Sequence, residues 1–206
     1  MNEKRYISEP IVLEQRANSE GVNEDFISGY GIVFNKWSSV LRMKTTKGDI
    51  INFIEKINPL ALDGLDTSNM VSMVDHTHTL GKRAKGTLDI TTDGYGVKYY
   101  VKVPNTTVGK DAKENIRNGN LEGSSFQFAI PNGGDSWDKT VTPHERTINK
   151  FSSVSEMGPV TYPAYPDTTA AMRSLETTEI EAPYEPNYKA IEMKSKILKL
   201  NKKNEQ

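Results

Sequence analysis

Two of the three histidines in the chain stand close together, in the stretch MVDHTHTLG at residues 73–81. His76 and His78 are two residues apart, and on a β-strand this spacing places both rings on one face. An imidazole ring can bind a metal ion, and near neutral pH it can also accept and release a proton. The pair therefore indicates a metal site, a proton shuttle for a nucleophile elsewhere in the chain, or a polar patch without chemistry.

A metal site at this pair would need further ligands. His144 is the third histidine of the chain, so His76, His78 and His144 could together form a three-imidazole site. No acidic residue stands at a spacing that completes a known metal motif. The chain has no cysteine, which excludes disulfides, thiolate zinc sites and a cysteine nucleophile. A metal-dependent hydrolase or oxygenase is thus an alternative, while our main expectation is a protein with no metal or other cofactor.

With cysteine absent, serine and threonine are the candidate nucleophiles, and each needs a base to take its proton. Ser125 follows Gly123 and Ser124 and opens the run SFQF, where period-two alternation places it on the face opposite the two phenylalanines. Glu156 opens the stretch EMGPVTYPAYPDTTA, and a carboxylate there could orient an imidazole. The plainer interpretations are a surface hydroxyl for Ser125 and an edge-strand charge for Glu156.

The charge balance excludes several classes of partner. The chain has 206 residues, with 26 Lys and Arg against 27 Asp and Glu, a net charge of −1 and an isoelectric point near 6.3. Nothing in this balance favours nucleic acid or an anionic membrane. We find no signal peptide at the N-terminus and no apolar run of the ~18 residues that a membrane span needs. We therefore expect a soluble, cytoplasmic protein that binds neither nucleic acid nor membrane.

Short strands dominate the expected secondary structure. We expect strands at residues 30–37, 70–78, 123–130 and within 145–160, and a hairpin over 86–103 that turns at Asp93-Gly94. Helices are expected only from Asn58-Pro59 to Gly64 and over 108–119. The sequence thus predicts an α+β, mainly β fold: a small closed or half-closed antiparallel β-barrel with peripheral helices. We expect one domain over residues 1–175 and a charged linker with a lysine-rich, helix-prone tail over 176–206.

Four stretches of the chain stand in a recognisable order over residues 29–173: GYGIVFN, VDHTHTLGKRAKGTLDITTDGYGVKYYVKVPNT, IRNGNLEGSSFQF and SEMGPVTYPAYPDTTAAMR. Together they resemble the prohead (capsid maturation) proteases of tailed bacteriophages, distant relatives of the herpesvirus assemblins. The resemblance implies a herpesvirus-protease-like barrel and a serine endopeptidase. It assigns His76 as the general base, Ser125 as the nucleophile and Glu156 as the carboxylate that orients the imidazole.

Some positions leave alternatives open. His78 and His144 are reserve candidates for the third member, because the assemblins use a second histidine in that role. Ser124 stands where the family usually has methionine, so it is an alternative nucleophile, and Gly158 stands where serine is common. The oxyanion would be stabilised by Arg146 or by a backbone N–H near Ser125.

The resemblance also implies a place and partners. The protein would be packaged inside the assembling prohead in the host cytoplasm, where it would cleave the capsid or scaffold precursor and also itself. Self-association into a dimer or a higher oligomer is expected. The linker after Arg173 would be the self-cleavage region, and the lysine-rich end would anchor the protein to scaffold. A non-catalytic capsid-assembly module is the second alternative.

Overall fold

The computed structural model describes residues 2–45 and 48–161. The linker and tail expected at 176–206, with the last part of the expected 1–175 domain, lie outside the described residues. Within them the structure is mainly β, as predicted, with a single α-helix, α1 (Thr107–Arg117), and two short 3₁₀ helices, η1 (Pro59–Leu62) and η2 (Arg83–Lys85).

The described strands form three sheets. The first, sheet A, has the order β1 (Glu3–Ile7), β10 (Gly123–Ala129), β13 (Ser153–Val160), β6 (Val71–Val74) and β7 (His78–Lys82). Sheet B has the order β2 (Val12–Ala17), β3 (Asn23–Val33), β9 (Gly96–Lys102) and β8 (Leu88–Thr92). Sheet C has the order β11 (Asp135–Asp138), β12 (His144–Ile148), β5 (Ile50–Ile57) and β4 (Leu41–Lys44).

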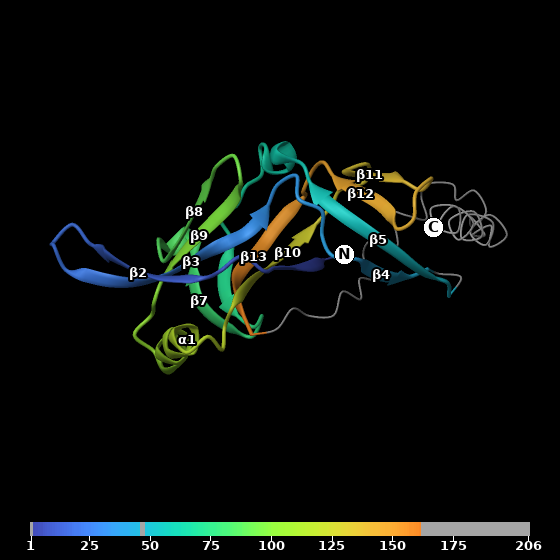
Figure 1. Cartoon of the computed structure of the whole chain (residues 1–206). Coiled ribbons are helices and arrows are strands. Elements are labelled where there is room, and N and C mark those ends of the chain that lie inside the picture. The colour runs from blue at the N-terminus through green and yellow to red at the C-terminus, as the bar shows by residue number, and fades with distance from the viewer. Residues whose placement is uncertain (1, 46–47, 162–206) are drawn as a thin grey trace, which may run out of the picture.

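The described strands do not close into a barrel, so of the expected architecture the mainly β character is confirmed and the barrel is not. Figure 1 shows sheet C gathered at one end of the molecule and the β2–β3 hairpin reaching out at the other, with sheet A between them. Two parallel pairings, β12 with β5 and β13 with β6, interrupt the antiparallel pattern that a meandering barrel would require.

Several predicted elements are confirmed. The hairpin over 86–103 forms as β8 and β9, and its turn is fixed by the Asp93 carboxylate, which accepts the N–H groups of Tyr95 and Gly96. Helix α1 is capped by Thr106, whose hydroxyl accepts the N–H of Gly109, and it ends before Gly119, which has a φ of 71°. The Asn58-Pro59 start is also confirmed, although the segment that follows it is the 3₁₀ helix η1.

The main core lies between sheets A and B. Strand β3 packs on β10 and β13, and β9 packs on β7. The fully buried side chains that fill this space include Ile27 and Ile32 of β3, Tyr99 and Val101 of β9, Phe126 and Phe128 of β10, and Met157 of β13. Burial of each such large apolar side chain is worth roughly 1.5–3 kcal/mol. The core therefore fixes β10 and β13 side by side, which matters because these strands carry Ser125 and Glu156.

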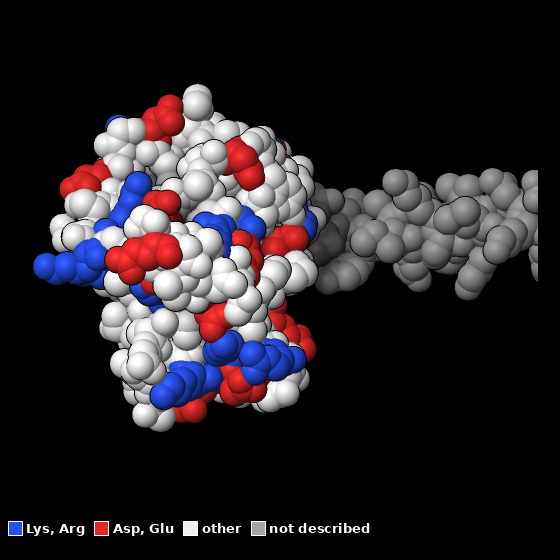
Figure 2. Space-filling model, turned by 90° about the vertical axis from the view of Figure 1, so that its left-hand side faces the viewer, with Lys and Arg blue, Asp and Glu red and all other residues white. Residues whose placement is uncertain are grey.

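The surface shows no large patch of one charge on the face drawn in Figure 2, where Lys and Arg side chains are interspersed with Asp and Glu. This matches the balanced composition. Among the described helices, none is both long enough and apolar enough to cross a membrane.

Candidate active site

His76 lies in the turn between β6 and β7. The N–H of Thr77 donates to the carbonyl of Val74 at 3.0 Å, and the two residues between them, Asp75 and His76, have positive φ values of 46° and 58°. This is the pattern of a type I′ hairpin turn. The sequence prediction of one continuous strand over 70–78 is therefore wrong: His78 begins β7, and the two histidines do not share a strand face.

The imidazole of His76 is paired with the carboxylate of Glu156. Nδ1 of His76 lies 2.6 Å from Oε1 of Glu156, and the side chains are 15% and 8% exposed. A carboxylate accepts hydrogen bonds, so this contact places the ring proton on Nδ1 and leaves Nε2 unprotonated when the ring is neutral. An imidazole held in that form can accept a proton at Nε2, which is what a general base requires.

Glycine at position 158 allows the backbone of β6 to lie close to the backbone of β13. A Cβ atom built on Gly158 would lie 2.1 Å from the carbonyl oxygen of Met73, a backbone atom that cannot move aside cheaply. Gly158 is also the cross-strand partner of Ser125. A side chain at residue 158 would therefore meet the backbone of β6, the strand that lies beside β13 in sheet A.

Ser125 lies on β10, the strand beside β13. Its partners across the sheet are Gly158 of β13 and Tyr6 of β1. Gln127, two residues along β10 and on the same face as Ser125, is opposite Glu156. Directly opposed residues share a face of the sheet, so Ser125 and Glu156 point to the same side of sheet A. The serine is 5% exposed, and its Oγ donates a hydrogen bond of 2.9 Å to the backbone carbonyl of Arg5 rather than to His76.

Ser124, the alternative nucleophile, points the other way. It is fully buried, and its hydroxyl is hydrogen-bonded to the hydroxyl of Tyr99 at 3.0 Å, inside the core between sheets A and B. Burial raises the pKa of the Tyr99 phenol, with the Ser124 hydrogen bond acting in the opposite direction. The predicted alternation along β10 is confirmed, and it separates the two serines onto opposite faces.

The three-histidine metal site is wrong. His144 begins β12 in sheet C, and its Nδ1 is hydrogen-bonded to the carbonyl of Val141 at 2.9 Å. No group of three or more His, Asp or Glu side chains within residues 2–45 and 48–161 could hold a metal ion. The side chain that contacts Nδ1 of His76 is that of Glu156, while His78 begins β7 and His144 begins β12.

Arg146 does not stabilise an oxyanion in this structure, because its side chain is fully buried in an ion cluster that joins sheet A to sheet C. It donates to Glu3 at 2.8 and 2.9 Å, to Glu55 at 3.1 Å and to Asp135 at 2.7 Å. The Arg5 side chain pairs with the same Glu3 and Glu55. The sequence analysis did not predict this cluster, because its members are spread from residue 3 to residue 146.

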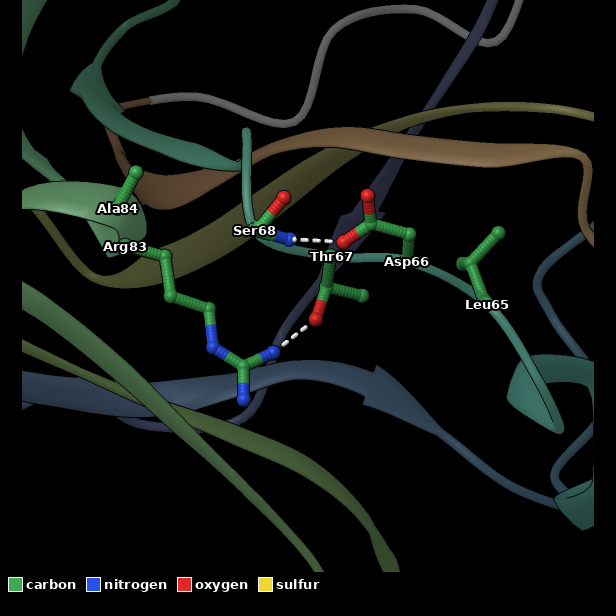
Figure 3. A pocket seen from close by; sticks show the side chains of 6 residues that line it. All are labelled: Leu65, Asp66, Thr67, Ser68, Arg83 and Ala84. Carbon is green, nitrogen blue, oxygen red and sulfur yellow. Dashed lines mark hydrogen bonds between the residues drawn. The ribbon is translucent and has the colours of Figure 1, made fainter.

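Two hollows lie near the β6–β7 hairpin. The larger, about 410 Å³, is shown in Figure 3: the guanidinium of Arg83 donates to the hydroxyl of Thr67, and Asp66 accepts the N–H of Ser68. Because these residues flank the start of β6 and the end of β7, this hollow is at the opposite end of the hairpin from His76. The smaller hollow, about 230 Å³, is lined by residues of helix α1 and by Val74, Asp75, Thr77 and His78. It therefore lies beside the turn that carries His76, although His76 itself does not line it.

Comparison with known proteins gives one match. A family model described as the caudovirus prohead serine protease matches residues 12–182 of the chain. No curated protein and no solved structure matches it. The matched residues include His76, Ser125 and Glu156, whereas strand β1, whose Arg5 carbonyl accepts the Ser125 hydroxyl, comes before them.

Proposed function

We propose, because the chain belongs to the caudovirus prohead serine protease family, that it is a serine endopeptidase whose catalytic residues are Ser125, His76 and Glu156. Proteins of this family act in the assembling prohead in the host cytoplasm, so the substrate class is capsid or scaffold precursor protein. The observation that carries the assignment is the 2.6 Å contact between His76 and Glu156, beside the strand that bears Ser125.

The contact between His76 and Glu156 supports the proposed roles. Glu156 holds the Nδ1 proton, so that Nε2 of His76 is the basic atom, and it stabilises the imidazolium that forms when His76 takes the serine proton. Ser125 then attacks the scissile carbonyl, and the imidazolium later returns the proton to the leaving amine. Loss of the nucleophile or the base of such a unit lowers the rate by about 10⁶-fold.

The Ser125 hydroxyl has to change partner before it can react. In the structure it donates to the Arg5 carbonyl, and a proton engaged there is not available to His76. Rotation about the Cα–Cβ bond of the serine moves Oγ between staggered positions without any movement of β10. We propose that substrate binding selects the rotamer that donates to Nε2. With Arg146 buried in the ion cluster, a backbone N–H near Ser125 is our candidate for the oxyanion donor.

Self-cleavage and self-association are part of the proposal. Thr161, the last residue that the structure describes, is hydrogen-bonded to Asp75, the neighbour of His76, so it lies beside the turn that carries the proposed base. The chain from Thr161 to the charged linker after Arg173 can span tens of ångströms, at roughly 3.3–3.6 Å per residue. A cut in that linker within the same molecule is therefore within reach, and a second copy of the chain could be cut in the same way.

The test uses a fluorophosphonate probe, which reports an activated serine without knowledge of the cleavage site. The attacking Oγ forms a bond to phosphorus and fluoride leaves, so the intact mass rises by one phosphonyl group. We expect the full chain to be labelled on Ser125, and Ser125→Ala to remain unlabelled. Ser124→Ala is the matched control, because it removes the adjacent hydroxyl on the opposite face, and it should be labelled like the wild type.

Cleavage is tested by co-expression with the capsid precursor encoded in the same genome. Wild type should shorten the precursor and lose a discrete C-terminal piece of its own, and Ser125→Ala should do neither. If Ser124→Ala loses its labelling as Ser125→Ala does, the choice of Ser125 as nucleophile is contradicted. A wild type that binds the precursor but is neither labelled nor able to cut it would instead be a non-catalytic assembly module.

A further inference from the structure

Asp75 joins the His76 turn to the end of β13 through three hydrogen bonds. Its backbone N–H donates to the carbonyl of Pro159 at 3.0 Å. Its two carboxylate oxygens accept from Thr161, Oδ1 from the backbone N–H at 2.7 Å and Oδ2 from the hydroxyl at 2.8 Å. Asp75 and Thr161 are 86 residues apart in the chain, so this is a tertiary link and not a local turn.

We propose that Asp75 and Thr161 are positioning residues that hold His76 against Glu156. Neither side chain is assigned contact with substrate, and both would act through the histidine. The inference rests on the proposed function for its catalytic meaning, but the placement of His76 can be measured in the free protein.

The first reason is that the side-chain bonds of Asp75 extend the contact between β6 and β13 to the turn itself. Strands β6 and β13 pair in parallel, with Glu156 opposite Val71. Further along, the two strands stay close: a Cβ atom built on Gly158 would lie 2.1 Å from the carbonyl oxygen of Met73, and the N–H of Asp75 donates to the carbonyl of Pro159. The two carboxylate bonds to Thr161 continue this contact past the ends of both strands, to the residue directly before His76.

The second reason is the backbone of the turn. Both Asp75 and His76 have positive φ, a region that costs non-glycine residues about 1 kcal/mol or more and persists where the surroundings enforce it. The three hydrogen bonds of Asp75 supply that enforcement directly at the first of the two residues. A turn released from them can relax, and a shift of about 1 Å in a catalytic group can cost 10²-fold in rate.

The test combines two variants, one rescue and one matched control. Thr161→Val removes the hydroxyl bond, and Asp75→Gly removes both carboxylate bonds while glycine accepts the positive φ. Thr161→Ser keeps the hydroxyl and is the rescue. Thr140→Val is the control, because Thr140 makes the same pair of bonds, through N–H at 2.9 Å and hydroxyl at 2.6 Å, to Asp138 in sheet C.

The readout in the free protein is the tautomer of His76, from long-range ¹H–¹⁵N spectra of the imidazole ring at a pH where the ring is neutral. Wild type, Thr161→Ser and Thr140→Val should show the proton on Nδ1. Asp75→Gly and Thr161→Val should lose that preference, with melting temperatures that show the domain is folded at the temperature of the spectra. Fluorophosphonate labelling of Ser125 should fall by about 10- to 100-fold in the same two variants.

The outcomes separate the two proposals. An unchanged Nδ1–H form in Asp75→Gly and Thr161→Val overturns the positioning role, whatever the labelling shows. Absence of that form in the wild type also overturns it, because His76 is then not held by Glu156. If the tautomer responds as expected but no chain is labelled, the positioning role stands and the proposed protease function fails. A merely structural role would lower the melting temperature and leave the tautomer of the folded protein unchanged.

Discussion

Replacement of Arg146 by methionine should destabilise the fold strongly, because it removes the centre of the buried ion cluster. Arg146 is fully buried and makes four hydrogen bonds to three carboxylates, those of Glu3, Glu55 and Asp135. Methionine fills a similar volume with no charge. Glu3 and Glu55 would keep their contacts with Arg5 and Asp135 would lose its contact with Arg146, so the summed charge of the cluster side chains would go from −1 to −2.

The expected loss of unfolding free energy follows from the carboxylates that lose their bonds to Arg146. Four charge-assisted hydrogen bonds at about 1.5–3 kcal/mol each set an upper bound, which relaxation and water entry reduce. Breaking a buried ion pair by removal of one partner costs about 3–5 kcal/mol, and we expect a loss in that range at neutral pH. A typical domain has a total stability of about 5–15 kcal/mol, so the variant should fold but unfold at a much lower denaturant concentration.

The loss should depend on pH in a defined direction. Burial by itself raises the pKa of the Glu3 carboxyl, but the hydrogen bond and charge of Arg146 and the charge of Arg5 outweigh it and hold the pKa below its ordinary value. A depressed pKa stabilises the fold above the unfolded-state pKa, and that stabilisation disappears as the pH falls through the folded-state value. The gap between wild type and Arg146→Met should therefore narrow from about pH 7 to about pH 3.

Urea unfolding of both chains at the two pH values measures the gap. Arg117→Met is the matched control, since Arg117 pairs with Glu114 on the surface of α1, where the side chains are 52% and 56% exposed. That change should cost less than about 1 kcal/mol. A loss below about 1 kcal/mol for Arg146→Met at neutral pH, or a loss that is equal at both pH values, would refute the electrostatic reasoning.

Three further predictions concern sheet A. Glu156→Gln should lower fluorophosphonate labelling of Ser125 by about 10⁴-fold in a folded protein, because an amide no longer selects the Nδ1–H form of the base; labelling within tenfold of the wild type would contradict this. Gly158→Ala should cost about 1–3 kcal/mol in urea unfolding, since its Cβ would lie 2.1 Å from a backbone oxygen, and an unchanged midpoint would contradict the close approach of β6 to β13 at that residue. Ser72→Ala should raise the urea midpoint slightly, or leave it unchanged, because the buried Ser72 hydroxyl has no hydrogen-bond partner among the described residues; a loss above about 1 kcal/mol would show that the hydroxyl is satisfied.

Local signals in the sequence predicted the parts of the fold that local chemistry determines. The Asp93 turn, the Thr106 cap with the Gly119 stop, and the alternation that separates Ser124 from Ser125 all depend on neighbours within a few residues. The β6–β7 turn was missed for a physical reason. Asp75 and His76 tolerate positive φ only modestly well, and tertiary bonds to β13 hold them there, so a local pattern of alternating residues was wrongly continued through the turn.

The candidate site was predicted through the family resemblance more than through spacing. The resemblance named His76, Ser125 and Glu156, and the structure brings His76 and Glu156 into contact across 80 residues. The roles of Arg146 and of β1 were not accessible in this way. A buried arginine and an exposed one look the same in a sequence, and the partners of Arg146 are fixed only when sheets A and C meet. The same lack of long-range information made a barrel the expected architecture in place of three open sheets.

The pairing of β1 has a consequence for when the site can come into existence. Of the described strands β1 is the first to be synthesised, yet its ladder partner, β10, is made more than a hundred residues later, and the Arg146 that binds Glu3 is 143 residues away. At the ordinary pace of translation, about 5–20 residues per second, β1 has no ladder partner for seconds while the rest of the chain emerges. Glu156, on the last strand, arrives later still. Under the proposed function, the catalytic residues are complete only when both ends of the domain have been made, so we expect no self-cleavage of a chain whose synthesis has not reached Glu156.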